Sequence, residues 1–182
     1  SLSGHKLYGP KGIGALFISK HSPIALEPLM HGGAQQDGRR AGTLPPFLCV
    51  GLGEACRLAE ELLPAELEHI ERLRRLLLSG LRDAVSRFVI NGDAAQSVPG
   101  CVNVRFPGAD AESLLMSLHR NIAISTSSAC NAGLIEPSYV LVALGLTPEE
   151  ASASIRFGFG RFTTDIEIES AIGLIGRKLA AS

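Results

Sequence analysis

The sequence has no excess of charge of either sign, since 17 Lys and Arg residues stand against 18 Asp and Glu residues. A nucleic-acid interface needs a basic surface, and this composition gives no indication of one. No apolar run approaches the ~20 residues that span a bilayer, and the first residues show no signal-peptide pattern. We therefore expect neither a nucleic-acid partner nor a membrane partner.

Cysteine is also sparse, at four residues of 182. That number is too small for a disulfide scaffold, and the lack of any Cys-x-x-Cys pair removes the usual zinc spacing. We therefore expect no metal site and a reducing, cytoplasmic location. Cys49, Cys56 and Cys101 lie among apolar residues on expected helices or strands, which indicates packing roles for them.

The composition is that of an ordinary globular protein, with 46% hydrophobic residues. The chain is long enough for one domain, or for one domain and part of another. Residues 31–46 have no periodicity and indicate a functional loop. Pro64 is expected to end one helix and open the next. The expected strands are 12–18, 87–90, 101–106, 122–125 and 154–159, and the expected helices are 47–62, 64–85, 110–119 and 165–180. This order predicts a compact α/β or α+β domain from Pro64 onward.

Lys6 lies in a turn-rich run, residues 3–14, between Ser3, His5 and several glycines. A lysine amine attacks a carbonyl only when it is deprotonated and held close to it. Glycines allow close backbone approach, and the serine hydroxyl and imidazole can donate hydrogen bonds to a phosphate. The run therefore indicates carbonyl chemistry beside an anion site, with a solvated surface lysine as the alternative.

Cys130 differs from the other cysteines because residues 125–133 are small and polar, with no apolar anchor. Structural cysteines favour apolar surroundings, whereas reactive ones are partly exposed. The pattern favours a reactive thiol on a loop, with an incidental loop thiol as the alternative.

Arg156 lies inside the apolar strand pattern at 154–159, where an arginine is costly unless it has a partner. A planar guanidinium suits the recognition of a carboxylate, and a structural ion pair is the alternative. Arg161 is interpreted as structural. Thr43 either binds a ligand or satisfies its own glycine-rich turn.

Taken together, four segments resemble the motifs of the cysteine desulfurases, pyridoxal-phosphate enzymes of the class V aminotransferase superfamily. The first is the cofactor-lysine motif in residues 1–12, and the second is Arg-Ala-Gly-Thr at 40–43. The third is Ser-Ser-Ala-Cys at 127–130 with Glu-Pro-Ser-Tyr at 136–139. The fourth is Ser-Ile-Arg-Phe at 154–157, leading to Gly-Arg-Phe-Thr-Thr at 160–164. The resemblance covers essentially the whole chain.

The resemblance implies a cofactor site for pyridoxal 5′-phosphate. Lys6 would hold the cofactor covalently, and Ser3 and His5 would contact its phosphate. Thr43 would reach the phosphate of the neighbouring subunit's cofactor, which implies a homodimer.

It also implies a reaction. Cys130 would take the sulfur of L-cysteine as a persulfide, alanine would be released, and Arg156 would bind the substrate carboxylate. The sulfur would pass to an acceptor such as an iron–sulfur scaffold protein. A selenocysteine lyase, another class V lyase, and a non-catalytic dimerisation or docking fragment stay open as alternatives.

The implied fold is the C-terminal part of a fold-type-I pyridoxal-phosphate enzyme, namely the end of the large domain and the small α+β domain. Residues 1–62 would be the remnant of the large cofactor-binding domain, with the lysine, the dimer loop and a connecting helix. Residues 63–182 would be the small domain with the catalytic cysteine loop. In the family other cofactor contacts precede the lysine, so we expect activity to need an N-terminal segment.

Overall fold

The computed structural model describes residues 1–93, 95–126 and 137–180. The chain forms two compact units, Ser1–Leu63 and Pro64–Ser182, which we call the N-terminal unit and the C-terminal unit. The sequence analysis assigned residues 1–62 to a remnant of the large cofactor-binding domain and residues 63–182 to the small domain with the catalytic cysteine loop. These two roles stay predictions. No helix within the described ranges is long and apolar enough to cross a membrane.

In the N-terminal unit, strand β1 (Leu2–Ser3) pairs antiparallel with β2 (Gly14–Ala15), and the 3-10 helix η1 (Gly4–Leu7) follows β1 directly. The strand predicted over 12–18 is wrong in extent and in burial, because Leu16 is 61% exposed and Phe17 is 82% exposed. β1 offers only two residues for pairing, so the ladder ends at Ala15. The loop predicted over 31–46 is confirmed up to Pro45, where α1 takes over.

Helix α1 (Pro46–Ala84) is continuous, so the prediction of two helices separated at Pro64 is wrong. An interior proline removes one hydrogen bond of the helix and costs about 3 kcal/mol. The flanking sequence, Glu-Leu-Leu before it and Ala-Glu-Leu after it, consists of strong helix formers that favour continuation. The boundary between the two units falls at this proline.

The C-terminal unit is built on an antiparallel sheet of order β3-β4-β5, formed by Val89–Ile90, Cys101–Arg105 and Ser154–Gly158. The strands predicted at 101–106 and 154–159 are confirmed to within one residue, whereas the strand predicted at 87–90 is confirmed only over Val89–Ile90. The strand predicted at 122–125 is reduced to a single bridge, in which Ser125 pairs with Arg156.

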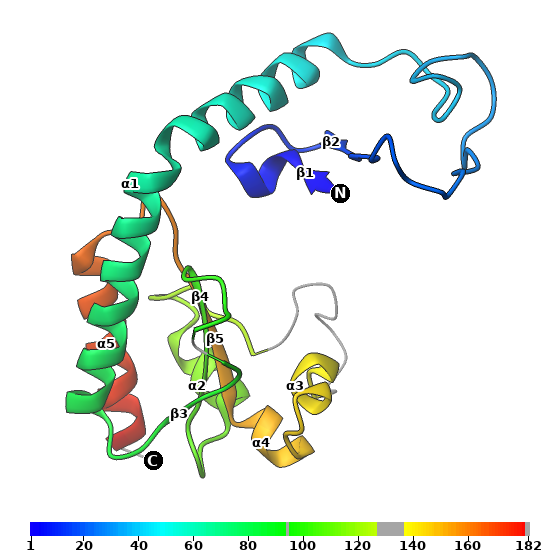
Figure 1. Ribbon diagram of the computed structural model, residues 1–182. Coiled ribbons are helices and arrows are strands. Elements are labelled where there is room, and N and C mark those ends of the chain that lie inside the picture. Colours follow the sequence, from blue (N-terminus) through cyan, green and yellow to red (C-terminus); the bar gives the residue numbers. More distant parts are fainter. Residues whose placement is uncertain (94, 127–136, 181–182) are drawn as a thin grey trace. The chain divides into compact units, whose positions relative to one another are not determined.

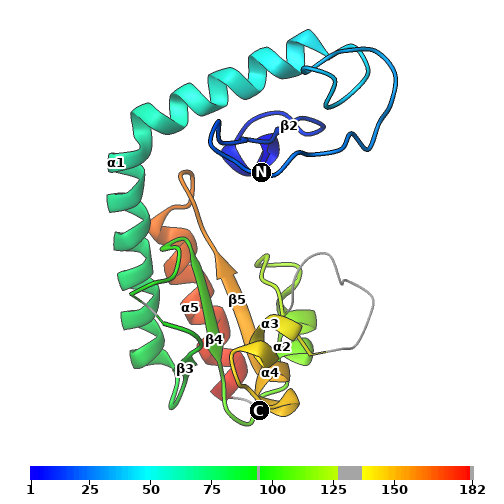
Figure 2. The same cartoon turned by 45° about the vertical axis from the view of Figure 1, so that its right-hand side comes forward.

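One face of this sheet carries the core. Helices α2 (Ala111–Leu118) and α5 (Asp165–Ala180) pack there with the second half of α1, and Figures 1 and 2 both show α1 and α5 side by side. The short helices α3 (Tyr139–Ala143) and α4 (Pro148–Ser152) lie away from α1 in both views. Core side chains with no exposed surface come from α1, β4, β5 and α5: Leu73, Leu77, Leu81, Val104, Ile155 and Ile175.

Polar contacts fasten α1 to the loop between β5 and α5. Arg161 donates to Glu66 Oε2 from Nε at 2.9 Å and from Nη2 at 2.7 Å, with side chains only 17% and 13% exposed. The His69 Nε2–H donates to the Thr163 carbonyl at 2.9 Å. These contacts agree with the structural role expected for Arg161.

Candidate functional site

The Lys6 turn is the first part of the site. Ser3 ends β1, and His5 and Lys6 lie in η1, so a hydroxyl, an imidazole and an amine follow one another within one short turn. His5 and Lys6 are exposed on the N-terminal unit and Ser3 is half-buried.

Two glycines hold the backbone of this turn in place. The Gly4 N–H donates to the Ile13 carbonyl at 2.9 Å. A Cβ at Gly4 would lie 2.8 Å from the Pro10 carbonyl oxygen, and a Cβ at Gly14 would lie 2.5 Å from the Leu2 carbonyl oxygen. Any side chain at either position would therefore displace backbone and the Lys6 turn with it.

The donor set of this turn fits a phosphorylated aldehyde. A phosphate favours several fixed hydrogen-bond donors, which the hydroxyl of Ser3 and the imidazole of His5 supply. An aldehyde needs an amine within reach, which Lys6 supplies. The residues present are thus the kind that pyridoxal phosphate requires.

Thr43 lies in the loop of the N-terminal unit that precedes α1. The Ala41 N–H donates to the Met30 carbonyl at 3.2 Å, and the Gly42 N–H donates to the Gln35 Oε1 at 3.2 Å. In the described part of the chain, these loop contacts leave the Thr43 hydroxyl unused. Thr43 is exposed, and its ligand-binding role stays a prediction.

Arg156 lies on β5 in the C-terminal unit. Its neighbours Ile155 and Phe157 are 0% and 4% exposed in the core, so alternation along the strand places Arg156 on the opposite, polar face. Arg156 is half-buried, yet no carboxylate among the described residues forms an ion pair with it. The alternative of a structural ion pair therefore finds no support in this part of the chain.

Arg156 is joined to the segment that leads to Cys130. The Arg156 N–H donates to the Ser125 carbonyl at 2.6 Å, and the Ser125 N–H donates back at 3.3 Å. Cys130 itself lies outside the described residues. The structure shows only that Ser125, which precedes Cys130 by five residues, is hydrogen-bonded to Arg156 on β5.

A polar cluster on the same face was not recognised from the sequence. Asn91 Nδ2 donates to Asn103 Oδ1 at 2.7 Å and to Ser154 Oγ at 2.9 Å. The Ser154 hydroxyl, which is fully buried, donates to the Glu150 carbonyl at 2.8 Å. The available signal was the alternation Val-Asn-Val-Arg at 102–105, which places Asn103 on a polar face.

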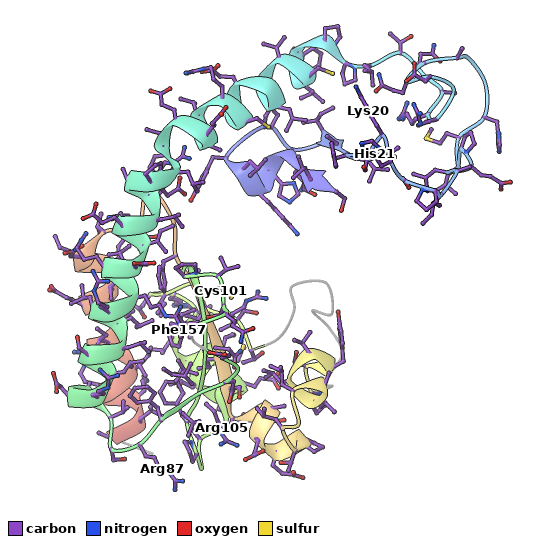
Figure 3. All side chains as sticks on the ribbon, viewed as in Figure 1. Lys20, His21, Arg87, Cys101, Arg105 and Phe157 are labelled. Atoms are coloured by element: carbon purple, nitrogen blue, oxygen red, sulfur yellow. The ribbon has the colours of Figure 1, made fainter. Side chains whose placement is uncertain are left out.

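The packing roles predicted for the other cysteines are wrong for Cys56 and Cys101, which are exposed; Cys49 is half-buried. Cys101 alternates with the buried Val102 and so lies on the polar face of β4, as does Arg105. Figure 3 labels Cys101 and Arg105 on this strand, and Phe157 among the core side chains. An apolar neighbour in the sequence did not imply an apolar environment in the sheet.

Comparison with known proteins fits this arrangement. The family model described as aminotransferase class-V matches residues 1–170. A cysteine desulfurase IscS from Aeromonas salmonicida is 51% identical over 175 residues, covering 96% of this chain and 43% of that protein. A mitochondrial cysteine desulfurase from Arthroderma benhamiae is 49% identical, covering 98% of this chain and 35% of that protein.

Solved structures agree with the sequence relatives. A NifS-like protein superposes with a TM-score of 0.84 at 31% identity, covering 99% of this chain and 46% of that one. DndA from Streptomyces lividans gives a TM-score of 0.69 at 37% identity, covering 87% of this chain and 45% of that one.

The chain belongs to the class-V aminotransferase family of pyridoxal-phosphate enzymes. Within that family its relatives named above are cysteine desulfurases, which confirms the resemblance seen in the four motifs. The cofactor class and the fold class expected from the sequence are confirmed with it. The chain spans 43% of the first of these curated relatives, somewhat less than half of its length.

Proposed function

We propose that this chain is the C-terminal part of a cysteine desulfurase, which converts L-cysteine to L-alanine and keeps the sulfur as an enzyme-bound persulfide. The observation that carries the proposal is the placement of Arg156. It is a half-buried arginine with no ion pair among the described residues, and its strand is hydrogen-bonded to the segment that leads to Cys130.

The cofactor would be held by the N-terminal unit. Lys6 provides the covalent attachment, and Ser3 and His5 donate to the phosphate. Thr43 reaches the phosphate in the neighbouring subunit of a homodimer, so that two chains complete each site. Pyridoxal phosphate, when bound, withdraws electrons from the substrate carbon atoms and so weakens the bond to sulfur.

The residues of this chain then divide the remaining tasks. The Arg156 guanidinium binds the carboxylate of L-cysteine and orients the amino acid. The Lys6 amine would move a proton at the substrate carbon atoms. The Cys130 thiolate would attack the substrate sulfur, so that a sulfur–sulfur bond forms as the carbon–sulfur bond breaks. The electron pair of the broken bond stays on the substrate carbon, which takes up a proton, and alanine leaves.

The wider setting of the reaction follows from the same proposal. The Cys130 persulfide passes its sulfur to an acceptor, such as an iron–sulfur scaffold protein, in the cytoplasm. Activity requires an N-terminal segment that completes the cofactor site. The alternative of a selenocysteine lyase is tested by comparing the reaction rates on L-cysteine and L-selenocysteine. The alternative of a non-catalytic fragment predicts that no borohydride-reducible cofactor adduct forms on Lys6.

The proposal predicts that Cys130→Ala, in the assembled cofactor-loaded enzyme, abolishes persulfide formation while the cofactor absorbance is retained. Cys101→Ala is the matched control and keeps both, because Cys101 lies in a regular strand rather than in the segment after Ser125. Mass spectrometry of the enzyme after incubation with L-cysteine measures the persulfide. Undiminished sulfide release by the Cys130 variant would contradict the assignment.

A further inference from the structure

Asn103 lies directly beside Arg156 on the polar face of the sheet. The register of β4 and β5 pairs the two residues, and directly opposite residues point to the same face. Arg156 exchanges both of its backbone hydrogen bonds with Ser125, and the Asn103 carbonyl accepts from the Asn91 N–H at 2.9 Å. Both backbones thus turn their polar groups away from each other. The pair is therefore of the non-hydrogen-bonded kind, with Cα atoms about 4.5 Å apart and side chains at their closest.

The orientation of the Asn103 amide is fixed by its neighbours. Its Oδ1 accepts from Asn91 Nδ2, and the second proton of that nitrogen is donated to the buried hydroxyl of Ser154. The Ser154 hydroxyl proton is donated to the Glu150 carbonyl, so Ser154 Oγ accepts from Asn91 and the Asn91 Nδ2 group must face it. Turning the Asn103 amide over would then set two N–H groups against each other, so Oδ1 faces Asn91. The Nδ2 group must then point away from Asn91. It has no acceptor among the described residues.

Two residues that carry unpaired donor groups are therefore direct cross-strand neighbours on this face. The Asn103 amide offers two N–H groups, and the Arg156 guanidinium offers five. The Asn103 Nδ2 group and the guanidinium cannot satisfy each other, since both are donors. A planar acceptor with two oxygens, which is what a carboxylate is, satisfies both at once.

We propose that Asn103 is a specificity-determining residue, whose amide joins Arg156 in binding the carboxylate of the amino-acid substrate. The inference rests on the proposed function of Arg156 and adds a second donor to it. The Asn91–Ser154 pair acts behind Asn103 by holding its amide in the donating orientation. A substrate without a carboxylate gains nothing from this arrangement.

The test is made on the assembled, cofactor-loaded enzyme with L-cysteine as substrate and cysteamine, the same thiol amine without a carboxylate, as inhibitor. A hydrogen bond to a charged group is worth roughly tenfold to a hundredfold in affinity. Asn103→Ala is therefore expected to raise the KM for L-cysteine by about that factor, with the inhibition constant of cysteamine unchanged. Asn103→Asp raises the KM further, because its carboxylate pairs with Arg156 in place of the substrate.

Controls separate the possible failures. Asn121→Ala, at an exposed asparagine, leaves both constants unchanged. Arg156→Lys tests the proposed function itself, which fails if this variant leaves the KM for L-cysteine unchanged. An unchanged KM in Asn103→Ala beside a raised KM in Arg156→Lys overturns the present inference alone. Equal weakening of L-cysteine and cysteamine by Asn103→Ala also overturns it, since that result indicates a structural role; Asn103→Ser replaces the alanine variant if the latter does not fold.

Discussion

At the scale of single residues, the sheet of the C-terminal unit separates two chemical environments by alternation alone. Val102 and Val104 enter the core, whereas Cys101, Asn103 and Arg105 take the polar face between them. A buried polar group on such a face must find partners, because an unpaired one costs about 1–3 kcal/mol. The hydrogen bonds among Asn91, Asn103 and Ser154 meet that requirement, and they leave the Asn103 Nδ2 group, next to Arg156 in the sheet, as a donor without an acceptor among the described residues.

Removal of the Ser154 hydroxyl tests this requirement. Ser154→Ala leaves a proton of Asn91 Nδ2 without its acceptor, at a site where Ser154 is 0% exposed. We expect a loss of about 1–3 kcal/mol in the free energy of unfolding, measured by urea denaturation. Ser152→Ala, at an exposed position in α4, serves as the control and changes stability little. Equal stability of the two variants would show that the buried hydroxyl is not required.

At the scale of the secondary-structure elements, the spacing of apolar residues predicted two helices of the C-terminal unit, but it did not predict which residues pair across the sheet. The helices at 110–119 and 165–180 were predicted from their apolar spacing and correspond to α2 and α5. The pairing of Arg156 with Asn103 was beyond prediction, because the register of β4 against β5 depends on residues more than fifty positions apart. The contacts that hold the Lys6 turn could not be predicted from the sequence either, because they join backbone groups and leave no pattern of side chains.

The start of β4 has a close backbone contact that a substitution can probe. The Phe159 N–H donates to the Gly100 carbonyl at 3.0 Å, and a Cβ at Gly100 would lie 2.6 Å from the Phe159 carbonyl oxygen. Gly100→Ala therefore forces backbone apart, and we expect it to destabilise the protein by about 1–3 kcal/mol in thermal or urea unfolding.

A matched variant exists in the partner strand. Gly158 in β5 has no atom within 4 Å of an added Cβ, so Gly158→Ala is expected to leave the unfolding free energy nearly unchanged. Equal effects at Gly100 and Gly158 would mean that the backbone contact relaxes at no cost.

At the scale of the whole molecule, the stability of the chain depends on pH through carboxylates at helix ends. The pKa of Asp165, at the start of α5, is held below its ordinary value of 3.8, first by the hydrogen bond from Arg72 and further by the charges of Arg72 and His69. The hydrogen bonds from Ser113 and from the Glu112 backbone likewise lower the pKa of Asp110 at the start of α2. Each folded carboxyl thus binds protons more weakly than its unfolded form.

The sign of the pH effect follows from linkage. The contribution of Asp165 is fully present above its unfolded pKa of 3.8 and is lost as the pH falls through the lower, folded value. We therefore expect Asp165→Asn to be less stable than the parent at neutral pH, with the difference shrinking below pH 3.8. Urea midpoints measured across the acid range test this, and a difference that stays constant to the lowest pH would contradict it.

The place of α5 in the core has a consequence for the synthesis of the protein. Ile168, Ile172 and Ile175 of α5 close the apolar face that β4 and β5 present, although α5 follows β5 in the chain and β4 precedes it by some sixty residues. While the chain is still emerging from the ribosome, α1 and α2 cover only part of the apolar surface of the strands until α5 has been translated. Translation proceeds at about 5–20 residues per second, so that surface is open to aggregation or to a chaperone for seconds.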